Sequence, residues 1–377
     1  MSKKLLLVVV LMVACAVLLS ACGAKQKDDT TLMIGALLPM TGSEATYGQD
    51  MLNSYKMAID EVNAAGGVLG YTLAMFNEDD ACDAQQANTA GAKIVSADPD
   101  FVVGGYCSGA TIPALQLFKD ADKLMLISAA NSSLITDLRL PQTFMINSPA
   151  GQQIDIFIKL VEKLGSQNVA IIHQGDDYTK NLSDLCYAML PAAGYNIVTT
   201  DVMQRGEPDL SAIVNKIRSA NADMVLWCGY YADGSNVIKQ LRNGGYTGDI
   251  CCGDGSSDTK LIEGSGPNGE GVYVLSPPYV KFSEKGSSYI EKYKSLYNGA
   301  EPGPYSTLCY DTIMLLVHGI EQAGSIETEA VTKAIEQNPY QQGLSGDLTF
   351  AADHTLQKSN FIVLRINAAA GEFELFL

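Results

Sequence analysis

Basic side chains are scarce in this chain. Its 377 residues contain 25 lysines and arginines against 42 aspartates and glutamates, which gives a formal net charge of −17 at pH 7. Nucleic acids and anionic lipid headgroups bind to basic protein surfaces. The excess of acidic groups therefore argues against both as partners.

The motifs of several enzyme classes are also missing. The sequence has no G-x-S-x-G elbow, no H-E-x-x-H and no Walker A motif, and its three histidines are far apart. Residues 264–269 match the letters of the dinucleotide fingerprint, but they precede an expected strand and contain proline, which favours a surface turn. The acidic pairs Asp79-Asp80 and Asp176-Asp177 are more typical of solvated loops than of cation sites. We therefore expect no enzymatic activity, no cofactor and no metal.

Only one apolar run stands out for its length, and it lies at the N-terminus. Lys3 and Lys4 precede the run 5–19, which is shorter than the roughly 18–20 residues of a membrane-spanning helix. Residues 1–21 are therefore expected to be a secretory signal peptide. The sequence Leu-Ser-Ala-Cys that ends at Cys22 resembles a bacterial lipobox, so we expect Cys22 to be lipidated and residues 22–30 to form an anchor and tether. An ordinary signal peptide followed by an incidental cysteine is the alternative. Either way the protein is expected outside the cytoplasm, where disulfides can form.

Strands and helices alternate along the rest of the chain. With 47% hydrophobic and 18% charged residues, the composition is that of a folded protein, and the length suggests two domains of roughly 150 residues each. The apolar runs expected to form strands are 32–38, 71–76, 101–105, 123–128, 168–173, 195–201, 223–228, 250–252, 271–275 and 360–366. The segments expected to form helices are 49–65, 83–97, 112–120, 151–164, 178–190, 209–220, 233–243 and 305–323.

This alternation predicts an α/β fold. Successive βαβ units give mainly parallel sheets with helices on both faces, and two such series predict two lobes. Ligands of open parallel sheets bind beyond the carboxyl ends of the strands. Those ends are at Leu38, Gly105, Ser128, His173, Cys228 and Cys252.

Several short motifs occur at or near these strand ends. They are Gly35–Gly42 with Tyr47-Gly48, Asp60–Gly67, Asp79–Asp83, Gly105–Ser108, Ile127–Ala130 and Gly253–Gly255. In their order and spacing the sequence resembles the leucine/isoleucine/valine-binding proteins and their relatives, the type I periplasmic solute-binding proteins of ABC importers. The resemblance implies two lobes joined by three crossovers that close on a ligand. It assigns 31–149 with 279–351 to the first lobe and 150–278 with 352–377 to the second.

The resemblance also implies a set of residues for an amino-acid ligand. Ser108, Ser132 and the backbone of Ala130 would hold the carboxylate, although a serine after a strand is often only a helix cap. Asp254 would hold the ammonium, although a carboxylate between glycines could equally be a turn residue. Tyr230 would present its ring face or hydroxyl to the ammonium.

An aromatic box completes the expected site. Its members are Tyr47, Tyr106, Tyr178, Tyr230 and Tyr305, each of which alone could be ordinary packing. The chain departs from the family at Tyr106, which replaces a smaller aliphatic residue, at Asn131 and Ser132, which replace Ala-Thr, and at Ile146, where many relatives carry arginine. A Tyr106 ring that points inward would favour a smaller ligand.

The family pattern also includes a cysteine pair. We expect a Cys82–Cys107 disulfide at the carboxyl ends of strands 71–76 and 101–105, taken as neighbours in the sheet. Cys186, Cys228, Cys251, Cys252 and Cys309 are odd in number, so at least one stays unpaired within the chain, and the sequence does not give their state.

The sequence therefore predicts a monomeric, lipid-anchored protein that binds an amino acid, with an aliphatic branched side chain slightly favoured, and delivers it to the permease of an ABC transporter. A ligand-sensing protein, a binder of another small amino-group solute and an extracytoplasmic enzyme are the alternatives. The ligand's identity, its affinity and the permease cannot be read from the sequence.

Overall fold

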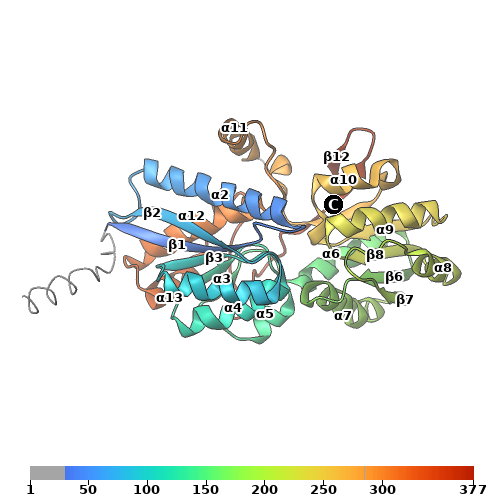
Figure 1. The fold of residues 1–377 in the computed structure, drawn as a ribbon, viewed down its shortest axis with the longest axis horizontal. Helices are drawn as coiled ribbons and strands as arrows, with labels where there is room; N and C mark the ends of the chain where they lie inside the picture. The colour runs from blue at the N-terminus through green and yellow to red at the C-terminus, as the bar shows by residue number, and fades with distance from the viewer. Residues whose placement is uncertain (1–29, 284) are drawn as a thin grey trace, which may run out of the picture.

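The computed structural model describes residues 30–283 and 285–377 and contains two β-sheets whose strands are mainly parallel (Figure 1). The expected signal peptide 1–21, Cys22 and the tether to residue 30 lie outside these ranges, apart from residue 30 itself. Within the described part of the chain, no helix has the length and apolar character needed to cross a membrane.

The first sheet has the order β2-β1-β3-β4-β5 and is parallel throughout. Its strands are β1 Thr31–Leu38, β2 Thr72–Asp79, β3 Phe101–Gly104, β4 Met125–Ile127 and β5 Thr143–Met145. The helices of this part of the chain are α2 Ala45–Ala64, α3 Ala84–Ser96, α4 Ser108–Asp120, α5 Ser133–Asp137, α11 Gly286–Leu296, α12 Ser306–Ala323 and α13 Thr328–Gln337. Helix α12 packs on α2 and α13, and α3 packs on α4. We call this sheet with these helices the first lobe.

The second sheet has the order β12-β11-β10-β9-β8-β6-β7. Its strands are β6 Asn168–His173, β7 Asn196–Val202, β8 Met224–Cys228, β9 Asp249–Cys252, β10 Tyr273–Ser276, β11 Ile362–Asn367 and β12 Glu372–Leu375, of which β11 and β12 pair antiparallel. The helices are α6 Ala150–Leu164, α7 Asp177–Ala192, α8 Ser211–Ser219, α9 Tyr231–Asn243 and α10 Thr259–Ser265, with single 3₁₀ turns η1 Asp254–Ser256, η2 Gly266–Gly269 and, next to α11, η3 Val280–Phe282. We call the second sheet with α6–α10 the second lobe.

The chain passes between the lobes three times. It crosses after β5, after β10 and before β11, and the lobes lie side by side with their sheets roughly end to end (Figure 1). The first and third crossovers are tied together, because the Ser148 hydroxyl donates to the Asn360 side chain at 2.6 Å and accepts the Asn360 N–H at 2.9 Å. The α/β fold with two lobes and three crossovers that the sequence predicted is therefore confirmed.

Apolar burial explains why these segments form strands. Leu32, Ile34, Ala36 and Leu38 of β1 are each at most 1% exposed, and their neighbour Leu37 packs into a second cluster on the other face of the sheet. A strand that is covered on both faces reads as a continuous apolar run, which is the pattern that the sequence shows. The carboxyl ends of the parallel strands of both sheets then face the gap between the lobes.

Candidate functional site

The loop after β3 brings the first lobe's expected ligand groups to the gap. A side chain at Gly104, which has φ +115°, would place its Cβ 2.3 Å from the Leu37 carbonyl oxygen, so only glycine permits this close approach. Helix α4 begins at Ser108 and not near Ile112 as expected, which makes Ser108 the first helical residue. Its buried hydroxyl accepts the Ser132 N–H at 3.3 Å.

The disulfide Cys82–Cys107 joins the loop after β3 to the turn that follows β2. The Cα atoms are 5.4 Å apart, and the expected pairing is confirmed. The expected strand order is wrong, because β1 lies between β2 and β3. The cysteines still meet because residues 81–82 turn with positive φ values (47° and 57°) after β2. The five other cysteines of the described residues are buried and free.

Ser132 and Ala130 follow β4, opposite α7 of the second lobe. The Ser132 hydroxyl caps α5 by accepting the Leu134 N–H at 3.3 Å, and it donates to the Asp177 carbonyl of α7 at 3.2 Å. The Ala130 N–H donates to the Gly105 carbonyl at 2.9 Å, so this donor is satisfied within the first lobe. Ser132 thus acts as a helix cap and also as a contact between the lobes.

Asp254 lies at the centre of the contacts between the lobes. It follows β9 in η1, its side chain is 2% exposed, and its carboxylate accepts hydrogen bonds from four neutral donors. These donors are Asn131 Nδ2 (3.0 Å), Asn147 Nδ2 (3.1 Å), Gln153 Nε2 (2.9 Å) and the Tyr178 hydroxyl (2.6 Å). Burial raises the pKa of Asp254, and the hydrogen bonds from Tyr178, Gln153 and Asn147 act in the opposite direction.

The amides around Asp254 show what the sequence reasoning missed. The sequence identifies Asn131 only as a departure from the family pattern, and it predicts no role for Asn147 or Gln153. Asn147 follows β5, a strand of three residues that the sequence pattern did not reveal, and Gln153 lies in the first turn of α6. Recognition of β5 would have placed Asn147 among the strand-end residues. Ile146, a further departure from the family, precedes Asn147, is fully buried and donates its N–H to the Ile127 carbonyl.

The expected tyrosines form one buried cluster across the gap. Tyr47 stacks on Tyr106 with ring centroids 4.7 Å apart, and Tyr305 meets both rings edge-on at 5.5 Å and 5.3 Å. From the second lobe, Tyr230 lies 6.2 Å from Tyr106 and 5.5 Å from Tyr178. The Tyr106 ring therefore points inward, which is the orientation that reduces the space for a ligand.

The tyrosine hydroxyls link the cluster to the polar centre. The Tyr305 hydroxyl donates to the Asp254 carbonyl at 3.1 Å, and the Tyr47 hydroxyl donates to the Gly255 carbonyl at 3.4 Å. Burial raises the pKa of both hydroxyls, so they stay neutral donors. A further tyrosine, which the sequence reasoning missed, is Tyr231, whose ring meets Tyr47 edge-on and whose hydroxyl donates to the Ser43 carbonyl at 2.7 Å.

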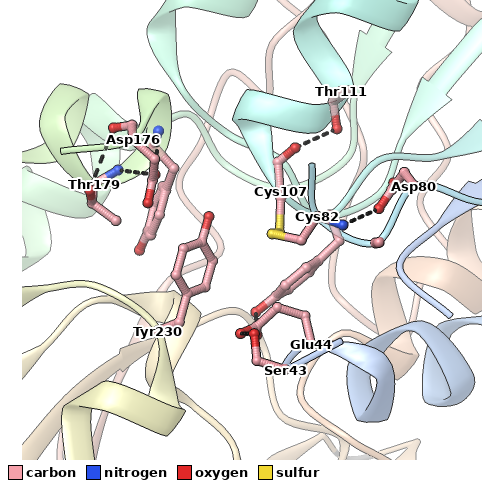
Figure 2. The surroundings of a disulfide bond; sticks show 12 residues. Ser43, Glu44, Asp80, Cys82, Cys107, Thr111, Asp176, Thr179 and Tyr230 are labelled. Carbon is pink, nitrogen blue, oxygen red and sulfur yellow. Dashed lines mark hydrogen bonds between the residues drawn. A yellow bond between two sulfur atoms is a disulfide. The ribbon is translucent and has the colours of Figure 1, made fainter. Parts of the chain in front are cut away.

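Two charged groups stand beside the tyrosines. Glu44, at the start of α2, is 1% exposed, and burial raises its pKa to about 7. Arg205 of the second lobe lies 5.0 Å from the centre of the Tyr230 ring and 3.6 Å from the Asp176 carboxylate. Figure 2 shows Glu44 and Tyr230 extending from different ribbons on either side of the gap. The sequence reasoning did not place Glu44 in the aromatic box.

The arrangement suits a small zwitterion. Hydroxyls and the N-terminus of α4 lie on the first lobe, a buried carboxylate lies on the second, and aromatic rings from both lobes meet beside them. A cavity of about 590 Å³, lined by residues of α5 and β5 together with Glu336 and His354, lies elsewhere and contains none of these residues. Within the described ranges, no group of three or more His, Cys, Asp or Glu side chains is placed to hold a metal ion.

Comparison with known proteins shows the family to which the chain belongs. Residues 31–371 match the profile of a family described as periplasmic binding protein. The "Amino acid binding protein" of Pseudomonas aeruginosa is 28% identical over 336 residues, covering 88% of this chain and 89% of the relative. A leucine-, isoleucine-, valine-, threonine- and alanine-binding protein of the same species is 26% identical over 334 residues, with 88% and 89% covered.

Solved structures share the fold. The leucine-binding protein of Thermotoga maritima superimposes with a TM-score of 0.84 at 23% identity, covering 92% of this chain and 98% of that one. A branched-chain amino acid transporter substrate-binding protein of Streptococcus pneumoniae, solved with isoleucine, gives 0.80 at 23% identity, covering 92% and 99%.

Proposed function

Because the chain belongs to the periplasmic binding protein family, we propose that it captures a free amino acid outside the cytoplasm and delivers it to the permease of an ABC transporter. The observation that carries the proposal is Asp254, a buried carboxylate at the contact between the lobes. The curated relatives, named as amino-acid-binding proteins, support the same ligand class. We propose no bond-making chemistry.

The hydrogen bonds of Asp254 explain why it needs a ligand. Its four donors are all neutral, and within the described part of the chain no lysine or arginine lies at salt-bridge distance from its carboxylate. A carboxylate in this buried position is costly to ionise without a cation. The ammonium of an amino acid supplies that cation and replaces the amides of Asn131 and Asn147.

The opposite end of the ligand belongs to the first lobe. Ser108, at the first turn of α4, and Ser132 offer hydroxyls, and the positive end of the α4 dipole favours a carboxylate. A ligand held by Asp254 on one lobe and by these serines on the other stabilises the closed state more than the open state. The lobes that close are residues 31–149 with 279–351 and residues 150–278 with 352–377.

The N-terminal segment supplies the proposed location. Export by residues 1–21 and lipidation of Cys22 would hold the protein at the outer face of the cell membrane, as a monomer that meets small solutes. Mass spectrometry of protein extracted from membranes should find diacylglycerol on an N-terminal Cys22. An unmodified N-terminus would contradict the anchor.

A thermal-shift screen over the twenty amino acids tests the ligand class. An amino acid at 100 times its Kd should stabilise the folded protein by about 2.7 kcal/mol. Chromatography of the same mixtures should recover the solute unchanged. If no amino acid raises the melting temperature, or if a solute is converted to product, the proposed function is wrong.

A further inference from the structure

Glu44 is a buried carboxyl group that the amino-acid site described above does not use. It is the last residue before α2, beside Tyr106, and its side chain is 1% exposed. Its oxygens accept hydrogen bonds from the Ser43 hydroxyl at 2.9 Å and from the Tyr106 hydroxyl at 3.4 Å. Both donors are neutral, and the second bond is long.

The charges near Glu44 leave it without a close cation. Arg205 attracts it from a distance, but this guanidinium is partly exposed and lies 3.6 Å from Asp176. Asp258 of the second lobe repels Glu44 and is itself buried. Among the residues that the structure describes, no lysine or arginine reaches salt-bridge distance of the Glu44 carboxylate. A buried carboxylate that has neutral donors but no cation is costly to ionise.

Tyrosine rings connect Glu44 with Asp254. Tyr106 donates to Glu44 with its hydroxyl and stacks on Tyr47 with its ring. Tyr305 meets the Tyr106 ring edge-on and donates to the Asp254 carbonyl. A chain of tyrosine contacts therefore runs from one carboxyl group to the other, and aromatic faces attract cations and tolerate alkyl chains.

We infer that Glu44 is a second binding subsite, and that it selects amino acids whose side chain ends in a nitrogen donor, an ammonium, guanidinium or amide group. The inference rests on the proposed function, in which Asp254 holds the α-ammonium. The ligand then spans the tyrosine cluster, with its α-ammonium at Asp254 and its side-chain nitrogen at Glu44. A purely aliphatic side chain, which the sequence slightly favoured, would leave the buried Glu44 with its two neutral hydrogen-bond donors and no cation.

Isosteric amino acids test this selection in the unaltered protein. Ornithine and norleucine have the same shape and differ by ammonium for methyl, and asparagine and leucine differ by amide for isopropyl. Calorimetric titration should show that ornithine, asparagine or both bind at least about tenfold more tightly than the apolar member of the pair, the effect of one charge-assisted hydrogen bond. Preference for ornithine would identify a cationic ligand, and preference for asparagine alone an amide.

Glu44→Gln should abolish the preference for ornithine over norleucine. Glu61→Gln is the matched control, because Glu61 lies near the other end of α2 and pairs with Lys292 on the surface. This control should keep the preference of the unaltered protein. Circular dichroism checks that both variants fold. If Glu44→Gln does not fold, the comparison of isosteric amino acids in the unaltered protein still tests the proposal.

Failure of the Glu44 subsite and failure of the proposed function give different experimental results. If norleucine and leucine bind as tightly as ornithine and asparagine, the role of Glu44 is wrong while the amino-acid function stands. The same conclusion follows if Glu44→Gln keeps the preference. If no amino acid binds, both the proposed function and the subsite are wrong.

Discussion

The pH dependence of stability offers a direct measurement of the burial of Glu44. In the folded protein the pKa of Glu44 is raised from 4.5 to about 7, mainly because burial disfavours the charged form. The hydrogen bonds from Ser43 and Tyr106 and the charge of Arg205 lower this pKa, and the charge of Asp258 raises it further. A raised pKa in an acid means that the folded state binds the proton more tightly than the unfolded chain does. The contribution to stability is therefore fully present below about pH 4.5 and is lost as the pH rises through about 7.

The size of the loss in folding stability follows from the size of the pKa shift of Glu44. A shift of this size corresponds to about 3 kcal/mol over the full range, and to about 2–3 kcal/mol between pH 5 and pH 8. Glu44→Gln keeps the shape of the side chain and removes its titration. The variant should therefore gain about 2–3 kcal/mol relative to the unaltered protein when the pH is raised from 5 to 8 without ligand.

Urea unfolding at pH 5 and pH 8 measures this difference. Asp50 and Asp311, with pKa values raised to about 6, and Asp80, with a value raised to about 7, also titrate in this range, but they contribute equally to both proteins and cancel in the comparison. If the free energies of unfolding of the two proteins differ by the same amount at both pH values, Glu44 is not buried as described. Binding of a cationic side chain should also lower the pKa of Glu44, so the pH dependence should weaken when ornithine is present.

Three further predictions concern the same region. Asp254→Ala should weaken amino-acid binding by several kcal/mol, because the α-ammonium loses its carboxylate in a buried site; unchanged affinity in a titration would refute the assignment of Asp254. Ser108→Ala should cost about 1.5–3 kcal/mol of binding, the range for hydrogen bonds to a charged group, and a smaller loss would show that Ser108 serves α4 and Ser132 alone. Replacement of both Cys82 and Cys107 by alanine should lower the free energy of unfolding by about 3 kcal/mol in the chain-entropy model for their separation of 25 residues; equal stability under reducing and oxidising conditions would contradict it.

The resemblance and the apolar pattern predicted the main elements because each of these segments carries its own signal. β6 begins and ends at the expected residues 168 and 173, and α6 and α7 differ from their expected ranges by one or two residues. The segments that were missed include β5 with three residues and α5 with five, which are too short to show a period, but also the longer helices α11 and α13. The three residues of β5 form a strand only because β4 is present to pair with them.

The strand order shows a different limit. The positions of Cys82 and Cys107 were correctly paired, but strands β2 and β3 are not neighbours, since β1 lies between them. The order of strands in a sheet depends on how the crossover helices pack, and a linear pattern of apolar residues does not contain it.

By itself the sequence determined the α/β class and the two lobes, and its resemblance to a known family implied the disulfide and the set of tyrosines, because apolar period, turn residues and motif order can be read along the chain. Only the tertiary structure decided that Asn131, Asn147 and Gln153 converge on Asp254 and that Glu44 is buried against Tyr106. A glutamate before a helix and an asparagine after a strand look like surface residues in the sequence. Their chemistry changes when the contacts between the lobes remove them from water, since the energy of a charge depends on everything that surrounds it and not on its place in the chain.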